Sequence, residues 1–331
     1  MERELLASIQ DLSVTYHTRI GPVSAVDHIS FDIYKGEILG LVGESGCGKS
    51  TLGKALLRMI DPPGEISSGH IIFDKEDVMQ YDDDRMRDFR GRRASMIFQD
   101  PMTSLNPMQR VDDHLIEAIQ VHEPKTSEKD ALKRSSIMIN RLGIGLNRLG
   151  SYPHQLSGGM RQRVMTGIGL VLNAELIIAD EATTSLDVIV EAKLADQLRE
   201  IRNEYGVSLL MITHNIALVA EMADRIAVMY AGHIVEIGDV YEVFEKPLHP
   251  YTQGLLGSVP SIQLNDRSEL FKMPGEPPNL THPPAGCRFH PRCQHAMPIC
   301  SQLEPALIKQ SSGQSVHCWL YQDHPDKNEK R

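Results

Sequence analysis

The sequence predicts an α/β fold built around a phosphate-binding loop, with an antiparallel β-layer before the loop, a helical insert after it and a small Cys-rich C-terminal appendage. Three observations lead to this prediction. A glycine-rich run at 43–51 follows an apolar strand-like segment and precedes a helical one. The apolar segment 176–179 is typical of a buried parallel strand and runs into two carboxylates. Residues 5–42 alternate between apolar and polar, which indicates a half-buried β-layer.

Composition narrows the class of protein. The chain has 331 residues, 41% of them hydrophobic, which is enough for two domains or for one large domain with an appendage. It contains no apolar run of about 18 residues and no secretory signal at its N-terminus, so we expect neither a membrane span nor export. The formal net charge of −10 argues against nucleic acid as a partner. The basic run 85–93 is interrupted by Asp88 and is typical of a solvated surface.

The segments before the loop are expected to be strands at 9–16 and 29–33, followed by the strand at 38–42 that enters the loop. Tyr16 ends the first of these strands. An aromatic ring at this place can stack on the flat face of an adenine. Judged from the residues alone, a half-buried β-sheet tyrosine is the more common use of such a position.

The loop has the sequence Gly43-Glu44-Ser45-Gly46-Cys47-Gly48-Lys49-Ser50-Thr51, which fits G-x-x-x-x-G-K-[ST]. Its glycines let backbone N–H groups turn toward a phosphate chain, and the following helix directs its positive end at the same anion. Lys49 is expected to reach the β- and γ-phosphates, and the Ser50 hydroxyl to hold Mg²⁺. Cys47 is interpreted as a small loop residue whose surroundings could favour oxidation. A glycine-rich turn that binds nothing is the alternative, and it leaves the Lys-Ser pair unexplained.

The insert is expected at about 105–172, where the hydrophobic pattern becomes helical. It follows a strand at 94–98, and Gln99 comes directly after that strand. Ser157-Gly158-Gly159 precede the last helix of the insert. Their N–H groups and the Ser157 hydroxyl suit an anion, although a plain helix N-cap has the same pattern.

Two further strand ends carry side chains that suit nucleotide chemistry. Asp180 and Glu181 follow the strand at 176–179, and in phosphate-loop enzymes one such carboxylate holds Mg²⁺ while a second orients the attacking water. A surface pair after a strand is the alternative. His214 follows the strand-like segment 207–213, where a neutral imidazole can bind a phosphate oxygen. A lone His at a strand end is more often structural.

The composition changes after an expected hairpin around Ala231-Gly232. Frequent prolines predict a linker or extended segment at 246–284, and the polar tail 322–331 is expected to be disordered. Between them, the region 285–321 holds Cys287, Cys293, Cys300 and Cys318. Without an export signal, such a cluster indicates a metal before it indicates disulfides. The spacing is wider than is usual for Zn²⁺, and four thiolates also suit a [4Fe–4S] cluster.

In this order the motifs resemble those of the nucleotide-binding subunit of an ATP-binding cassette (ABC) transporter, along nearly the whole chain. The resemblance implies an ABC-type ATPase domain at 1–245. It assigns ATP binding to 43–51, with Lys49 also catalytic, Mg²⁺ binding to Ser50, Gln99 and Asp180, catalysis to Glu181 and His214, and adenine stacking to Tyr16. It further assigns Ser157-Gly158-Gly159 to the signature that contacts the ATP of a second subunit, and Asp187 to the D-loop.

More narrowly, the segments 98–107, 157–163, 249–252 and 286–293 resemble those of peptide and nickel importers, and Met160 suggests their D-type ATPase. The resemblance implies di- or oligopeptide import from the cytoplasmic face of the membrane, as a peripheral subunit. The implied partners are two membrane subunits, a non-identical F-type ATPase arranged head to tail and, indirectly, an extracytoplasmic solute-binding protein. It also implies a [4Fe–4S] cluster at the four cysteines, with Zn²⁺ or unligated thiols as alternatives.

Other interpretations stay open on the sequence alone. Nickel, glutathione or oligosaccharide could replace peptide as the transported substrate, and the cysteines permit a redox sensor. A non-transport ABC ATPase of DNA repair or chromosome organisation usually carries a long insertion before the signature, where this chain has only about a hundred residues. Ala182 and Ser185 differ from the usual family residues without removing a functional group, so we expect activity to be retained.

Overall fold

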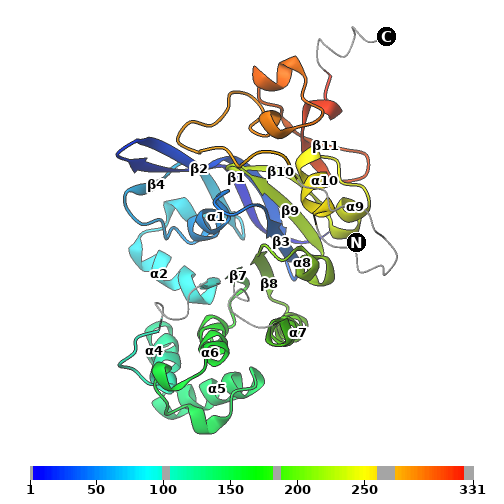
Figure 1. The fold of residues 1–331 in the computed structure, drawn as a ribbon. Coiled ribbons are helices and arrows are strands. Elements are labelled where there is room, and N and C mark those ends of the chain that lie inside the picture. The colour runs from blue at the N-terminus through cyan, green and yellow to red at the C-terminus, as the bar shows by residue number, and fades with distance from the viewer. Residues whose placement is uncertain (1–2, 99–104, 182–187, 259–272, 324–331) are drawn as a thin grey trace, which may run out of the picture. The chain divides into compact units, whose positions relative to one another are not determined.

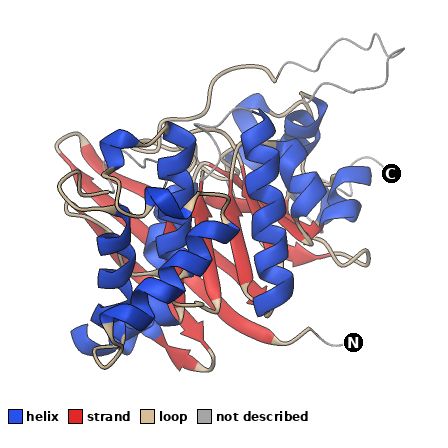
Figure 2. Cartoon of the chain, turned by 90° about the horizontal axis from the view of Figure 1, so that it is seen from below, coloured by secondary structure: helices blue, strands red, loops and turns tan. Residues whose placement is uncertain are grey.

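The structure of the chain is a computed structural model that describes residues 3–98, 105–181, 188–258 and 273–323 (Figure 1). The chain divides into two units, each assembled from stretches that are far apart in sequence. The helical unit contains Met1–Ala7, Ile33–Ile38 and Phe73–Thr213, and the phosphate-loop unit contains Ser8–Asp32, Leu39–Ile72 and His214–Arg331. Both helices and strands are present, which confirms the predicted α/β class (Figure 2).

The β-layer before the loop is formed by β1 (Leu5–Thr18) and β2 (Gly21–Tyr34). β4 (Gly64–Phe73), which follows the loop in sequence, joins it in the order β2-β1-β4. Ile29, Phe31 and Ile33 are buried while the residues between them are not, because successive side chains on a strand point to opposite faces. The strands extend beyond the predicted 9–16 and 29–33. Only two residues connect β1 to β2, so pairing can continue to the end of the hairpin.

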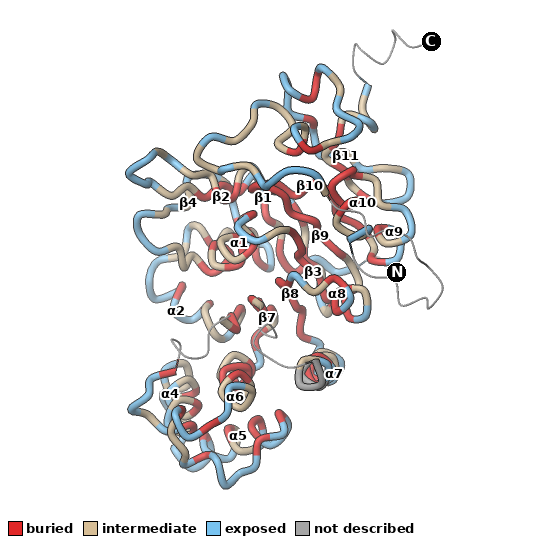
Figure 3. Tube along the Cα trace, viewed as in Figure 1, coloured by how far each residue is buried: buried red, intermediate tan, exposed pale blue. Residues whose placement is uncertain are grey.

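A second sheet in the phosphate-loop unit leads the chain into the loop. β3 (Ile38–Val42) is buried along its whole length and pairs in parallel with β9 (Arg225–Tyr230), with Leu41 opposite Ala227. Both strands are coloured mostly as buried in Figure 3. An apolar strand without alternation is what a parallel sheet covered on both faces requires.

The same sheet continues into the Cys-rich region, in the order β11-β12-β10-β9-β3. β10 (His233–Asp239) forms the predicted hairpin with β9, and both residues of its turn, Ala231 and Gly232, have positive φ. β12 (Ser315–His317) pairs antiparallel with β10, and β11 (Leu307–Lys309) with β12. The C-terminal region is therefore joined to the sheet through backbone hydrogen bonds.

The helices of the phosphate-loop unit are short. They are α1 (Lys49–Leu56), α8 (Ile216–Met222), α9 (Val240–Glu245) and α10 (Pro250–Gly257), with 3₁₀ turns at His290–Arg292, Pro298–Ser301 and Trp319–Tyr321. α10 corrects the expectation of a linker or extended segment throughout 246–284. Pro250 is favourable at a first helical position, and the His249 side chain accepts a hydrogen bond from the Tyr251 N–H as the N-cap.

The tail expected to be disordered at 322–331 is only partly described. The Gln322 side-chain amide donates a hydrogen bond to the Ala306 carbonyl at 2.7 Å, and its Oε1 accepts one from the Ala306 N–H at 3.2 Å. This residue is therefore anchored, which corrects the expectation for the first part of the tail. Residues 324–331 lie outside the described part of the chain.

The helical unit contains three parallel strands in the order β8-β7-β6. β6 (Ala94–Ile97), β7 (Leu176–Asp180) and β8 (Ser208–Ile212) are buried at every position, with Leu176 of β7 opposite Ala94 and Ser208. The short β5 (Glu76–Asp77) belongs to the same unit. The apolar strand predicted before Asp180 is thus present and ends at that residue.

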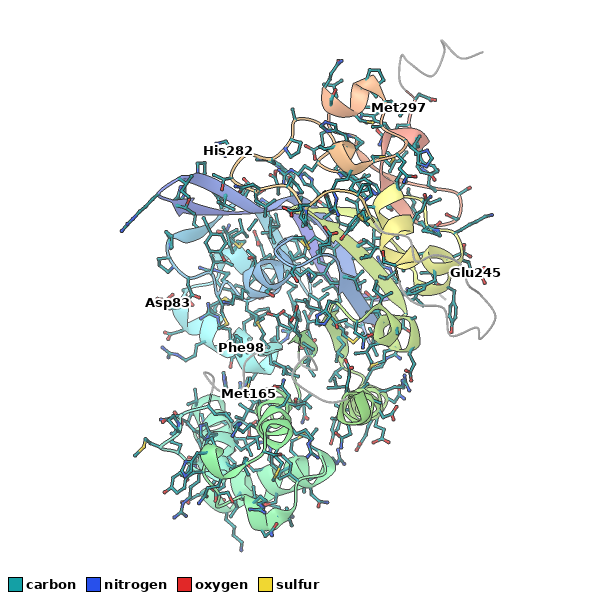
Figure 4. All side chains as sticks on the ribbon, in the orientation of Figure 1. Asp83, Phe98, Met165, Glu245, His282 and Met297 are labelled. Atoms are coloured by element: carbon teal, nitrogen blue, oxygen red, sulfur yellow. The ribbon has the colours of Figure 1, made fainter. Side chains whose placement is uncertain are left out.

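The insert is helical, as its apolar stripes predict. The helical unit as a whole contains α2 (Asp83–Arg92), α4 (Val111–His122), α5 (Glu128–Arg141), α6 (Gly158–Leu170) and α7 (Val188–Tyr205), with 3₁₀ turns at Val78–Gln80, Leu146–Arg148 and Pro153–Gln155. Leu115, Ile139 and Val164 bring α4, α5 and α6 together in one core, which includes Met165, labelled in Figure 4. Among the described residues, no helix is both long and apolar enough to cross a membrane.

Candidate functional site

The phosphate-binding loop connects β3 to α1, and two of its glycines, Gly43 and Gly48, leave no room for a side chain. Gly48, the N-cap of α1, has φ 108°, and a Cβ there would lie 2.0 Å from the Ala25 carbonyl oxygen. A Cβ on Gly43 would lie 2.1 Å from the Met229 carbonyl oxygen. These close backbone contacts fix the curvature of the loop, and the N-terminal turn of α1 follows directly from it.

Lys49 supplies the positive charge of the loop. Lys49 is 5% exposed, and its Nζ donates hydrogen bonds to the carbonyl oxygens of Gly43 at 2.9 Å and Glu44 at 3.0 Å. The ammonium group is therefore held inside the curve of the loop by the loop's own backbone. The Cys47 Sγ lies 3.8 Å from the Lys49 Nζ, and burial raises the pKa of this thiol. A protonated, buried thiol is a poor nucleophile, which argues against the oxidation-sensitive role considered for it.

The loop is also held from the C-terminal region, by residues for which the sequence analysis predicted no role. Arg292 makes a two-point ion pair with the Glu44 carboxylate, and its side chain is 6% exposed. The Glu44 N–H donates a hydrogen bond to the Tyr251 hydroxyl at 2.9 Å. Arg292 additionally donates to the Tyr230 hydroxyl at 3.2 Å and to the Pro274 carbonyl at 2.9 Å. Both the backbone and the side chain of Glu44 are thereby fixed.

The only sequence signals for these partners were the segments 249–252 and 286–293, which carried the family resemblance without a function for either residue. Tyr251 is fully buried, and its ring centroid lies 4.5 Å from that of Tyr230. The bidentate contact with Glu44 raises the pKa of Arg292 further above its ordinary value, so this cation is permanent.

Two other predicted residues of the phosphate-loop unit lie outside the loop. Tyr16 is half-buried on β1, and a Cβ added to Gly64 would lie 2.5 Å from its ring. His214 is exposed and directly precedes Asn215, the N-cap of α8, whose Oδ1 accepts a hydrogen bond from the Leu218 N–H at 3.2 Å. The start of α8 thus fixes the backbone at the His214 position.

The helical unit holds the predicted carboxylates and the signature. Asp180 is buried at the end of β7. Glu181 follows with φ 45°, and its N–H donates to the Ile212 carbonyl at 2.9 Å. A left-handed conformation at a residue other than glycine is strained, and such strain is concentrated at functional sites. Gln99 and Asp187, together with Ala182 and Ser185, lie outside the described residues.

The signature residues form an exposed turn at the start of α6. Ser157 is the N-cap, and its hydroxyl accepts a hydrogen bond from the Met160 N–H at 3.3 Å. Gly158 is exposed, and a Cβ there would meet no atom within 4 Å. The helix-capping role considered from the sequence is therefore present. The turn also leaves room beside the positive end of a 13-residue helix, which suits an anion.

The four C-terminal thiols share one neighbourhood. Burial raises the pKa of Cys318 to about 12, and each of the other three thiols adds to this shift. Burial also raises the pKa of Cys287 to about 11, with contributions from Cys300 and Cys293. Backbone N–H groups point at the sulfurs, from His295 to Cys293 at 3.3 Å and from Met297 to Cys300 at 3.5 Å. N–H donors to sulfur also occur around metal and iron–sulfur groups, but no three of these four described sulfurs lie within 4.8 Å of one another.

Comparisons with known proteins agree with these observations. The family described as ABC transporter matches residues 26–184, and the family described as oligopeptide/dipeptide transporter, C-terminal region, matches residues 235–300. The dipeptide transport ATP-binding protein DppD of Bacillus subtilis is 45% identical over 320 residues, which cover 96% of this chain and 95% of the relative. The oligopeptide transport ATP-binding protein OppD of the same organism is 42% identical, covering 97% and 90%.

A relative from a second organism and a solved structure extend the comparison. The dipeptide transport ATP-binding protein DppD of Escherichia coli is 41% identical over 315 residues, covering 95% of this chain and 96% of the relative. The ATP-binding cassette MJ0796, solved as a dimer in a post-hydrolysis state with ADP and phosphate, superposes with a TM-score of 0.65. It is 23% identical and covers 71% of this chain and 99% of its own, so it supports the cassette fold alone.

Proposed function

This chain belongs to the ABC transporter family of ATP-hydrolysing subunits, and we propose that its ATPase powers the import of dipeptides and oligopeptides through partner membrane subunits. The observation that carries the proposal is the extent of the likeness. Relatives named for dipeptide and oligopeptide transport align along more than nine-tenths of this chain, and the peptide-transporter C-terminal region matches residues 235–300.

The loop geometry supports a separate role for each of several residues in ATP hydrolysis. Lys49 and the first turn of α1 bind the β- and γ-phosphates, because one supplies a held cation and the other supplies N–H donors. Tyr16 stacks on the adenine. Glu181 orients and deprotonates the attacking water, while His214 and Lys49 stabilise charge on the γ-phosphate. Gln99, which lies outside the described residues, is assigned by the family resemblance to the nucleotide site and to the contact with the membrane subunits.

Magnesium fits the donor set proposed for it. The Ser50 hydroxyl, the Asp180 carboxylate and the Gln99 amide are oxygen donors, which Mg²⁺ prefers, and Asp180 ends a buried strand. When bound, Mg²⁺ supplies charge neutralisation between the phosphates. Asp180 is the last residue of β7, and Ser50 is the second residue of α1, so a secondary-structure element fixes the backbone at each.

The family implies an ATPase dimer bound to membrane subunits. We propose a head-to-tail pair with a non-identical F-type subunit, in which Ser157-Gly158-Gly159 of one subunit meet the nucleotide of the other and Asp187 lies at the interface. The exposed N-terminus of α6 supports this role. The pair would lie at the cytoplasmic face of the membrane, held by two permease subunits and supplied by an extracytoplasmic solute-binding protein.

We also propose that Cys287, Cys293, Cys300 and Cys318 hold a [4Fe–4S] cluster, with Zn²⁺ as the alternative. The four-thiolate ligand set and the N–H donors to the sulfurs of Cys293 and Cys300 support an iron–sulfur group. Protein purified without oxygen should contain about four irons and four acid-labile sulfides per chain. Stoichiometric zinc, or metal-free protein with four reactive thiols, would rule the cluster out and leave the ATPase assignment unchanged.

The transport proposal is tested by reconstituting the chain with its membrane subunits, partner ATPase and binding protein in liposomes. ATP hydrolysis should rise when a mixture of di- and oligopeptides is enclosed with the binding protein. Nickel, glutathione and oligosaccharide serve as the competing substrates. Stimulation by one of these and not by peptides would replace the proposed substrate class while retaining the ATPase role.

A further inference from the structure

Three titratable side chains from separate segments converge beside β10, with His317 directly before Cys318 in sequence and Glu304 four residues after Cys300. His233, Glu304 and His317 each offer a ligand atom, and these atoms all lie within 4.8 Å of one another. His233 Nδ1 is 2.9 Å from Glu304 Oε1, and His317 Nε2 is 3.6 Å from the same oxygen. We propose that these residues form a binding site for one divalent transition-metal ion, of which Zn²⁺ is the most suitable.

The separations match those of a metal site. Zinc–nitrogen and zinc–oxygen bonds of about 2.0–2.2 Å in a tetrahedron place neighbouring ligand atoms roughly 3.3–3.6 Å apart. The two measured separations, 2.9 and 3.6 Å, lie close to these values, so small side-chain rotations suffice. Two imidazoles and one carboxylate are the ligand types that zinc shares with other borderline metals, and three protein ligands leave a fourth position for water.

The topology explains how the rings come together. β10 and β12 are antiparallel neighbours with Glu236 opposite Val316, which brings the first residue of β10, His233, near the last residue of β12, His317. Their rings stack with centroids 5.5 Å apart and planes at 27°. Glu304 approaches from the segment before β11. A metal bound here would connect three segments of the chain.

The surroundings orient the ligands as a metal site requires. His233 Nε2 is buried without a hydrogen-bond partner and lies 3.5 Å from Asp27 Oδ2, so metal binding at Nδ1 would place the remaining N–H toward a carboxylate. Asp27 in turn pairs with Arg288. His317 forms a hydrogen bond with the Pro305 backbone, which helps to hold its ring in place.

The charge balance also permits a dication. Glu304 and Asp27 contribute two negative charges, and Arg288, the neighbouring cation, is already engaged by Asp27 and the Ala231 carbonyl. His233 and His317 are nearly buried, with side chains 8% and 14% exposed, whereas Glu304 is 50% exposed. The ion can therefore enter from the Glu304 side. Once bound, it would fasten the C-terminal hairpin β11-β12 onto β10.

Cobalt(II) distinguishes this site from the four thiols, because thiolate coordination gives intense charge-transfer absorption that nitrogen and oxygen ligands do not. The full chain, purified with its cysteine site occupied, is titrated with Co²⁺, and the added d–d and charge-transfer absorptions are recorded as difference spectra. We expect one Co²⁺ per chain with visible d–d bands and no added thiolate charge transfer. Glu304→Gln should weaken this binding at least about a hundredfold, since even residues that only support a ligand typically change metal affinity 10–100-fold.

The matched control is His282→Ala, which removes an exposed histidine of the same region, labelled in Figure 4. It should leave the cobalt affinity unchanged. His317→Gln is the second ligand variant, and its melting temperature without metal shows whether it folds. Zn²⁺ should raise the melting temperature of the wild type and not of either ligand variant. Cobalt bound solely through thiolates, or equal affinity in wild type and Glu304→Gln, would overturn the proposal.

Discussion

Arg292 forms a bidentate ion pair with Glu44 of the phosphate-binding loop, with Nη1 2.7 Å from Oε2 and Nη2 3.0 Å from Oε1. Arg292 is also the residue before Cys293, one of the four C-terminal thiols. A single side chain thus connects the cysteine region to the backbone that positions Lys49. The state of the cysteine region and the shape of the nucleotide loop are therefore physically linked.

Replacing Arg292 by Ala is expected to weaken ATP binding about tenfold, since Glu44, whose carbonyl orients Lys49, loses its side-chain restraint and keeps only the backbone contact with Tyr251. The free energy of unfolding should fall by roughly 2–3 kcal/mol, less than for a fully buried pair because Glu44 keeps partial contact with water. Nucleotide titration and urea denaturation measure the two effects. Arg288→Ala is the control, because it breaks the pair with Asp27 without touching the loop. Unchanged ATP affinity in Arg292→Ala would contradict the link.

Gly48→Ala and Gly46→Ala should differ in stability although both glycines have positive φ. The new Cβ at position 48 would lie 2.0 Å from the Ala25 carbonyl oxygen, whereas the one at position 46 meets no atom within 4 Å. Gly46→Ala should therefore lower the free energy of unfolding by only about 1–2 kcal/mol, the strain of a left-handed alanine. Gly48→Ala should cost more, because the backbone must also move. Equal melting temperatures for the two nucleotide-free variants would disprove this geometry.

Glu181→Gln is expected to preserve ATP binding and to lower turnover about 10²–10⁴-fold, the usual contribution of a general base. Gln has the same shape and backbone requirement as Glu, so the strained φ of 45° is unaffected. ATP affinity and hydrolysis are measured in the assembled transporter. Hydrolysis at the wild-type rate would remove Glu181 from its proposed role.

His249 should make the protein less stable in acid. Its ring is buried, Nδ1 accepts a hydrogen bond from the Tyr251 N–H at 3.0 Å, and burial lowers its pKa from 6.5 to about 3. Because the unfolded chain takes up the proton first, the contribution of His249 to the free energy of unfolding is full above pH 6.5. This contribution declines as the pH falls toward about 3. Between these two pH values the free energy of unfolding falls by about 1.4 kcal/mol per pH unit.

The measurement for His249 is urea denaturation of the wild type and His249→Asn at a series of pH values. Asn can cap α10 without titrating, so the difference between the two proteins isolates the histidine. The wild type should lose stability more steeply than the variant below about pH 6.5, the ordinary pKa of histidine. Parallel curves would show that His249 does not titrate as its burial indicates.

The sequence was sufficient for features that depend on neighbouring residues. The glycines and Lys49 identified the loop, the apolar run before Asp180 identified a buried strand, and Ala231-Gly232 identified a hairpin turn. Such patterns are informative because φ preferences, helix capping and side-chain periodicity act over a few residues. The expectation of a linker was wrong at α10, where Pro250 begins a helix rather than preventing one.

The contacts that hold the loop were decided by the tertiary structure. Arg292 and Glu44 are 248 positions apart, and no local pattern relates an arginine before a cysteine to a glutamate in a glycine-rich turn. The convergence of His233, Glu304 and His317 likewise depends on β12 pairing with β10. The sequence by itself thus determined the class of fold, the family and the chemical groups for ATP hydrolysis. Which distant side chains support those groups depended on strand order and burial, since non-local contacts arise only when the chain has folded.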